Sequence, residues 1–131
     1  MPKLVQYEDA PEDVRRVYDE IKQARNIPDV TNFWKAIANH PPTLRRIWDQ
    51  MREVMGPGAL DPLTKELVFL AAAMAHGCEY CTASHAASAK AKGMSREMLG
   101  EVLAIVALSA QTHVLADTWR VPLDPFYERQ P

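Results

Sequence analysis

Helix start and stop signals follow one another so closely in the second half of this chain that they leave room only for helices and short turns. Asp61 followed by Pro62 is a typical helix start, because aspartate caps free backbone N–H groups and proline suits the first helical position. Gly77 and Gly93 are typical helix ends, and Ser95 can cap the segment that follows. The predicted helices are 62–75, 78–92 and 96–118. No useful stretch alternates apolar and polar residues as a strand would, so we predict an all-α fold.

The first half of the chain carries similar helical signals. Apolar residues recur at helical spacing in 11–24 and 32–39, and Thr43 is expected to cap a third helix that reaches Met55. Gly56-Pro57-Gly58 breaks the chain, but the part on either side looks too small for an independent domain. We therefore predict a single domain over residues 1–131, with its core at about 30–120. It is expected to be a helical bundle whose central helical hairpin carries two cysteines.

The predicted helix 96–118 has apolar residues spread around it, and this bears on assembly. A helix of 23 residues is ~35 Å long, whereas a compact domain of this length has a radius of gyration of only ~14 Å. One subunit can hardly cover such a helix, so we predict a homo-oligomer.

Charge and composition exclude several classes of protein. A net charge of −2 with interspersed basic and acidic residues offers no surface for nucleic acid, and no glycine-rich phosphate loop indicates a nucleotide cofactor. The apolar runs 67–75 and 102–108 are shorter than the ~20 residues of a membrane span, and the first residues lack the apolar core of a signal peptide. We therefore predict a cytoplasmic protein with no membrane contact, no nucleic-acid partner and no cofactor.

Cys78 and Cys81 are the chain's two cysteines, and in the cytoplasm a disulfide is rarely a passive cross-link. Three residues apart at the start of a helix, their sulfurs share one face and can come close enough to bond. The helix N-terminus favours thiolate over thiol. His85, one turn after Cys81, can take its proton and then hold the thiolate. The pattern indicates a redox-active dithiol.

Glu66 is a carboxylate in an otherwise apolar helix, where burial without a partner would be costly. If Gly77 is the apex of a hairpin, reflection places Glu66 opposite about residue 88, which is ~4.5 Å of helix rise from His85. We therefore predict that Glu66 pairs with His85, directly or through water. Glu66, His85, Cys81 and Cys78 would then form a proton relay that ends in a dithiol.

Plainer alternatives exist for each of these residues. The two thiols could be buried and unreactive, and Glu66 could be a surface carboxylate favoured by the helix dipole. A zinc site could be completed by Cys78, Cys81, His85 and either His76 or Glu66. No second ligand pair occurs at finger-like spacing, so we predict no metal.

The spacing Glu66-x11-Cys78-x-x-Cys81-x-x-x-His85 resembles the motif of the alkylhydroperoxidase D-like proteins of the carboxymuconolactone decarboxylase superfamily. The resemblance extends to segments 34–41, 58–61, 65–68, 86–87 and 92–95, and so covers about residues 30 to 105. It implies an all-helical fold, assembly as trimers or hexamers, and a cysteine pair that reduces peroxides or passes electrons to a partner. It also implies that Cys81 attacks peroxide, that Cys78 resolves it, and that Glu66 and His85 activate Cys81 through a water.

One position departs from this pattern, since the best-studied branch has a histidine where this chain has Tyr80. A tyrosine hydroxyl, with a reference pKa of ~10, cannot shuttle protons as imidazole does, although it can donate a hydrogen bond. His76 is a candidate substitute.

The leading hypothesis is a thiol-dependent peroxidase or disulfide oxidoreductase that acts on a peroxide or small disulfide. Its reductant would be a thiol or a peroxiredoxin-like protein. The alternatives are a lactone decarboxylase-type lyase and a non-catalytic, redox-responsive oligomer.

Overall fold

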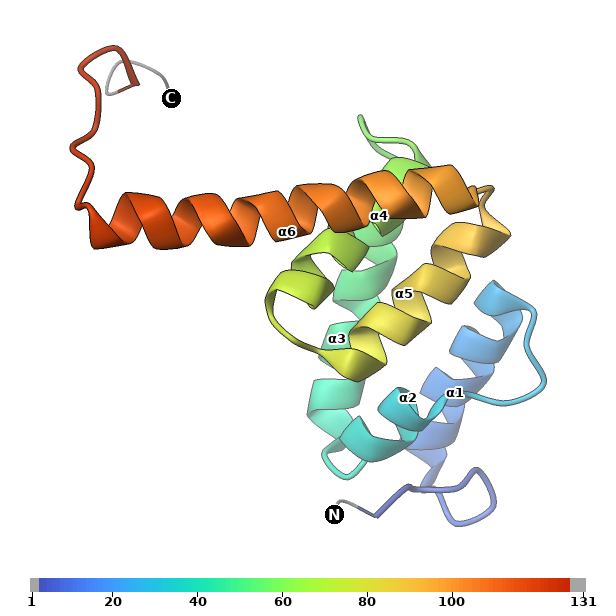
Figure 1. Cartoon of the computed structure of the whole chain (residues 1–131). Coiled ribbons are helices and arrows are strands. Elements are labelled where there is room, and N and C mark those ends of the chain that lie inside the picture. Colours follow the sequence, from blue (N-terminus) through green and yellow to red (C-terminus); the bar gives the residue numbers. More distant parts are fainter. Residues whose placement is uncertain (1–2, 128–131) are drawn as a thin grey trace. The chain divides into compact units, whose positions relative to one another are not determined.

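In the computed structural model, residues 3–127 are described, and the regular elements among them are six α-helices (Figure 1). The predicted all-α class is therefore confirmed. Backbone contacts group the chain into two compact units, Met1–Pro57 and Gly58–Pro131. A single domain over the whole chain stays a prediction.

The first unit consists of α1 (Glu12–Arg25), α2 (Asn32–Ile37) and α3 (Pro41–Met55), packed around an apolar core. Its largest fully buried side chains include Tyr18 of α1, Trp34 of α2 and Leu44 of α3. The rings of Trp34 and Trp48 meet edge to face, with centroids 5.6 Å apart. The Tyr18 hydroxyl donates a 2.9 Å hydrogen bond to the Val5 carbonyl, so this buried polar group is satisfied.

The start of α3 corrects one prediction. Thr43 was expected to cap this helix, but α3 already begins at Pro41, and His40 is its N-cap residue. The missing N–H groups of Pro41 and Pro42 cost nothing in a first turn, where they would have no partner inside the helix. The Thr43 hydroxyl instead lies 2.8 Å from His40 Nδ1.

The second unit consists of α4 (Pro62–Ala75), α5 (Glu79–Ala91) and α6 (Arg96–Thr118), so the predicted boundaries hold to within one residue. The cap signals act as expected: Asp61 accepts from the Thr64 N–H at 3.0 Å, and Ser95 accepts from the Met98 N–H at 3.1 Å. α4 and α5 pack side by side as the predicted hairpin (Figure 1). Gly77, with a φ of +69°, reverses the chain between them.

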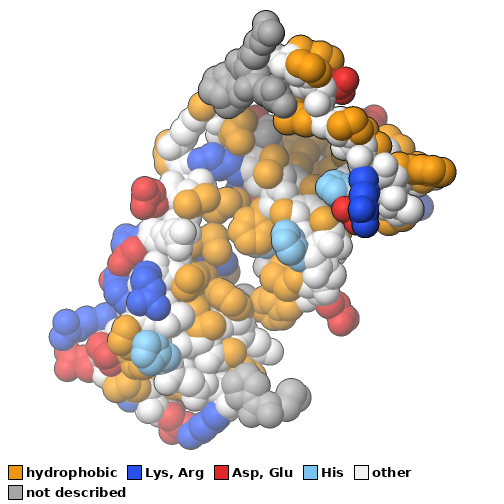
Figure 2. Space-filling view, turned by 90° about the vertical axis from the view of Figure 1, so that its left-hand side faces the viewer, with side chains coloured by type: hydrophobic (Ala, Val, Ile, Leu, Met, Phe, Trp, Pro, Cys, Tyr) orange, Lys and Arg blue, Asp and Glu red, His pale blue; other side chains and the backbone are white. Residues whose placement is uncertain are grey.

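α6 packs against α4, but none of its residues is buried in this single chain. Large apolar side chains along it, such as Ile105 and Leu108, are more than half exposed. Hydrophobic side chains lie at the surface in the upper half of Figure 2, where α6 points toward the viewer. α4 is apolar over most of its length, yet it is not fully buried either, because Val68 is 57% exposed.

α6 is also long and apolar enough to cross a membrane, by length and composition alone, with a mean hydropathy of 1.5. Its longest uninterrupted apolar run, 102–108, is far shorter, but a mean hydropathy taken over the helix tolerates interspersed small polar residues. Core helices of globular proteins meet the same criterion.

Candidate functional site

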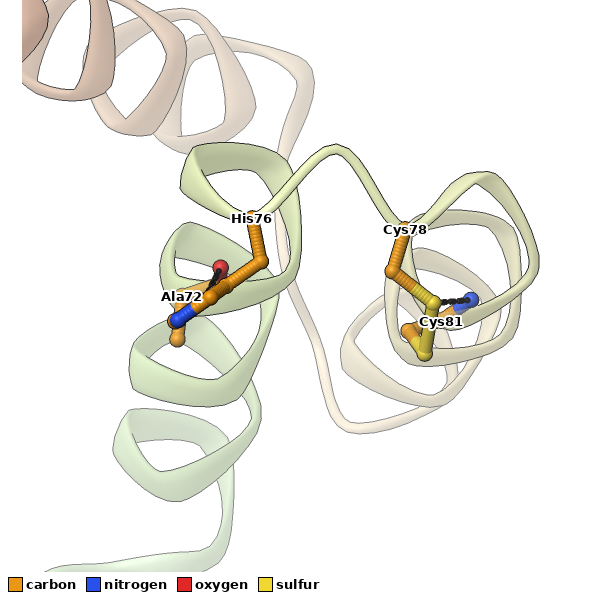
Figure 3. The surroundings of a disulfide bond; sticks show 4 residues. All are labelled: Ala72, His76, Cys78 and Cys81. Carbon is orange, nitrogen blue, oxygen red and sulfur yellow. Dashed lines mark hydrogen bonds between the residues drawn. A yellow bond between two sulfur atoms is a disulfide. The ribbon is translucent and has the colours of Figure 1, made fainter.

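Cys78 and Cys81 are joined by a disulfide at the N-terminus of α5, with their Cα atoms 5.3 Å apart (Figure 3). Cys78 is the N-cap residue of the helix, and its sulfur accepts a 3.2 Å hydrogen bond from the Cys81 N–H. The Cys78 N–H donates to the Ala73 carbonyl at 3.0 Å, which ties the start of α5 to the last turn of α4. Both cysteines are half-buried. The pair therefore lies on a fixed backbone and remains partly open to solvent.

Glu66 and His85 form the predicted contact across the hairpin. Glu66 Oε2 lies 2.8 Å from His85 Nδ1, and the side chains are only 7% and 13% exposed, respectively. The interpretation of Glu66 as a surface carboxylate is therefore wrong. A buried carboxylate close to the imidazole can fix both the orientation of the ring and the nitrogen that carries the proton.

Two further side chains contact this pair, and neither was predicted from the sequence. Phe69, three residues after Glu66 on α4, stacks on the His85 ring with centroids 3.6 Å apart and planes inclined by 17°. Lys92, the C-cap residue of α5, donates from Nζ to Glu66 Oε1 at 2.9 Å. The available signal was spacing: Lys92 lies one helical turn beyond residue 88, the point opposite Glu66 in the reflected hairpin.

The two other candidates, His76 and Tyr80, are exposed. His76 is exposed, and Figure 3 shows its ring directed toward Ala72 of its own helix, with Nδ1 2.8 Å from the Ala72 carbonyl oxygen. Tyr80, in the first turn of α5, is 45% exposed. Within residues 3–127, no hydrogen bond joins His85 to either sulfur. The structure thus brings Glu66 and His85 together, while the His85–Cys81 step of the relay stays a prediction.

Metal binding was weighed as an alternative for these residues. With the sulfurs bonded to each other, no three His, Cys, Asp or Glu side chains in the described part of the chain are grouped so that they could hold a metal ion.

What the arrangement can do chemically follows from its parts. Two cysteines that can form a disulfide with each other can accept or supply two electrons. Their position at a helix N-terminus stabilises a thiolate on reduction, because the first N–H groups of a helix have no partner inside it, and the Cys81 N–H already donates to the Cys78 sulfur. The neighbouring imidazole, braced by a carboxylate, a lysine and an aromatic ring, can move a proton.

Comparison with known proteins agrees with this description. Residues 42–123 match the model of the carboxymuconolactone decarboxylase family. The crystal structure of the alkylhydroperoxidase AhpD core from Rhodospirillum rubrum ATCC 11170 is 40% identical in sequence. The match covers 99% of this chain and 98% of that one, with a TM-score of 0.94. None of the curated proteins matches the chain significantly.

Proposed function

Because the chain belongs to the carboxymuconolactone decarboxylase family and is AhpD-like, we propose that it is a thiol-dependent peroxidase and disulfide oxidoreductase. One observation carries the proposal: a cysteine pair able to form a disulfide opens the same helix that carries His85, whose Nδ1 lies 2.8 Å from the buried Glu66. The first feature supplies a two-electron carrier, and the second supplies a proton acceptor of defined orientation.

The proposed reaction begins with the reduced pair. Cys81 transfers its proton to His85 Nε2, directly or through a water, and the thiolate attacks the outer oxygen of a hydroperoxide. The O–O bond breaks, and the alkoxide leaves as an alcohol after taking a proton. Cys81 becomes a sulfenic acid. The Cys78 thiol then displaces hydroxide from that sulfur, which forms the disulfide and releases water. Two thiols and one hydroperoxide thus give one disulfide, one alcohol and one water.

A dithiol reductant, small or borne by a peroxiredoxin-like protein, would close the cycle. Its thiolate attacks one sulfur of the disulfide, and the other sulfur leaves as a thiolate. Cys78 is suited to leave, because its sulfur already accepts the Cys81 N–H. The second thiol of the reductant then attacks the mixed disulfide, which releases the attacked cysteine as a thiolate and leaves the reductant as a disulfide. Tyr80 and His76 are proposed as accessory residues, since both are exposed near the cysteines in sequence and carry hydrogen-bonding groups.

We further propose a cytoplasmic homo-oligomer, a trimer or a hexamer, that needs no cofactor. The support is the exposed apolar surface of α6, which a second copy of the chain can cover. Contact between copies of α6 would also explain why this helix carries apolar side chains on faces that α4 does not cover.

Intact mass spectrometry tests the proposal. The reduced protein is mixed with one equivalent of an alkyl hydroperoxide, and its mass is followed over time. We expect a rapid loss of two hydrogen atoms in the wild type, no such loss in Cys81→Ser, and one added oxygen atom in Cys78→Ser. No mass change on the time scale of a free thiol would refute the peroxidase. Lactone decarboxylation that survives loss of both cysteines would instead favour the lyase alternative.

A further inference from the structure

We infer that Lys92 is a positioning residue of this site, because its bond to Glu66 fixes which nitrogen of His85 carries the proton. The inference rests on the proposed function for its chemical meaning but on geometry for its evidence. It adds a residue at the far end of α5, seven positions beyond His85, to the machinery around the cysteines.

The first step concerns the two oxygens of Glu66. Oε1 lies 2.9 Å from Lys92 Nζ, and Oε2 lies 2.8 Å from His85 Nδ1. An ammonium group can only donate, so Oε1 must accept. In its ion pair with the ammonium, Glu66 is a carboxylate and has no proton of its own to give. Oε2 must therefore accept as well, and His85 Nδ1 must be the donor.

The second step concerns the imidazole. A neutral ring with its proton on Nδ1 has a free lone pair on Nε2, and this is the nitrogen that can take a proton from a thiol. Without the ammonium, Oε1 loses the partner that orients the carboxylate, and Oε2 is no longer held against Nδ1. A ring without this fixed acceptor at Nδ1 can carry its proton on Nε2 instead, where it cannot accept another. Lys92 thus selects the tautomer that the proposed reaction needs.

The third step concerns how firmly Lys92 is held. Its backbone N–H donates to the Ser88 and Ala89 carbonyls, and Gly93, with a φ of +102°, ends the helix directly after it. The backbone of Lys92 is thereby fixed relative to α5. Its side chain is 40% exposed, against 7% for Glu66, so the lysine reaches from solvent onto a buried carboxylate. A cation at a helix C-terminus is also favoured by the dipole.

The test compares four proteins in their reduced, full-length form: wild type, Lys92→Met, Lys92→Arg and Lys90→Met. Lys90 is a matched control, because it lies on the same last turn but about 200° around the helix from Lys92. A second neutral variant, Lys92→Gln, serves if Lys92→Met does not fold. The primary measurement is ¹⁵N NMR of the His85 ring, whose two nitrogens differ strongly in shift between the N–H and lone-pair states.

We expect one tautomer, with the proton on Nδ1, in the wild type, Lys92→Arg and Lys90→Met. The neutral variants at position 92 should give a mixture and react with hydroperoxide about tenfold more slowly. An unchanged Nδ1–H signal in Lys92→Met would overturn the inference, and so would a failure of Lys92→Arg to restore it. If the wild type itself does not react with hydroperoxide, the proposed function fails. The NMR result would still decide the role of Lys92.

Discussion

Replacing Glu66 with glutamine tests the Glu66–His85 pair most directly, because the side chains of glutamate and glutamine have the same shape. A carboxylate accepts at both oxygens, whereas an amide offers one accepting oxygen and one donating NH₂ group. With Lys92 bound to the amide oxygen, the NH₂ group faces His85 Nδ1, which must then accept. The histidine proton moves to Nε2, and the base that we propose for Cys81 is lost.

The expected size of the effect follows from the contacts. General-base catalysis contributes ~10²–10⁴-fold, so we expect Glu66→Gln to slow single-turnover oxidation by at least ~10²-fold. Each charge-assisted hydrogen bond that becomes neutral loses about 1 kcal/mol, although Lys92 is partly exposed and can turn to water. The neutral amide is also cheaper to bury. The free energy of unfolding should therefore fall by only about 1 kcal/mol, so the variant folds.

The assay is rapid mixing of reduced protein with hydroperoxide, followed by acid quench and intact mass. Glu79→Gln is the matched control, since it removes the same charge from an exposed residue beside Cys78. It should react at the wild-type rate. Wild-type kinetics in Glu66→Gln would refute the role given to the buried carboxylate. Equal slowing in both variants would mean that net charge, not the orientation of His85, sets the rate.

Three other predictions concern the rest of the chain. Burial raises the pKa of Tyr18 to about 12, above its ordinary value of ~10. The neutral Tyr18 side chain contributes its full stability below pH ~10. As the pH rises toward ~12, the free energy of unfolding should fall by about 2 kcal/mol. In denaturant unfolding, Tyr18→Phe should not show this alkaline loss. Gly77→Ala should lower the free energy of unfolding by about 1 kcal/mol, because φ at this position is +69°. Gly100→Ala should raise it, because Gly100 lies inside α6 with open space around it. A change of the same sign in both variants would contradict this reasoning. Leu108→Glu, which charges an exposed position of α6, should convert the oligomer to monomer in sedimentation velocity, and a monomeric wild type at micromolar concentration would rule out the proposed assembly.

Local chemistry explains why the second unit could be predicted so closely from sequence. Asp61, Gly77 and Ser95 each act on a backbone group within a few residues, and the structure shows the caps and the left-handed turn that they predict. The prediction that Thr43 caps α3 was wrong, because His40 and the two prolines after it start the helix about one turn earlier. The exposure of Val68 on α4 could not be foreseen from one chain, because apolarity does not say which molecule covers a face.

The candidate site was predictable in part for a related reason. Glu66 stood out because a carboxylate in an apolar helix needs a partner, and hairpin reflection pointed to the turn that holds His85. Lys92 did not stand out, since a lysine at a helix end is favourable with no partner at all. Phe69 looked like an ordinary core residue, because a ring that packs on a histidine and one that packs on a leucine have the same sequence pattern.

The sequence separation of three between the bonded cysteines has a consequence for the energetics of the redox cycle. A cross-link stabilises a fold chiefly by restricting the unfolded chain, and that restriction grows with the length of the loop it closes. A bond within a single helical turn closes almost the shortest loop possible, so making or breaking it changes the entropy of the unfolded chain very little. In the proposed cycle, opening and closing this bond should therefore change the free energy of unfolding very little, so that oxidation and reduction can alternate without bringing the protein near its unfolding transition.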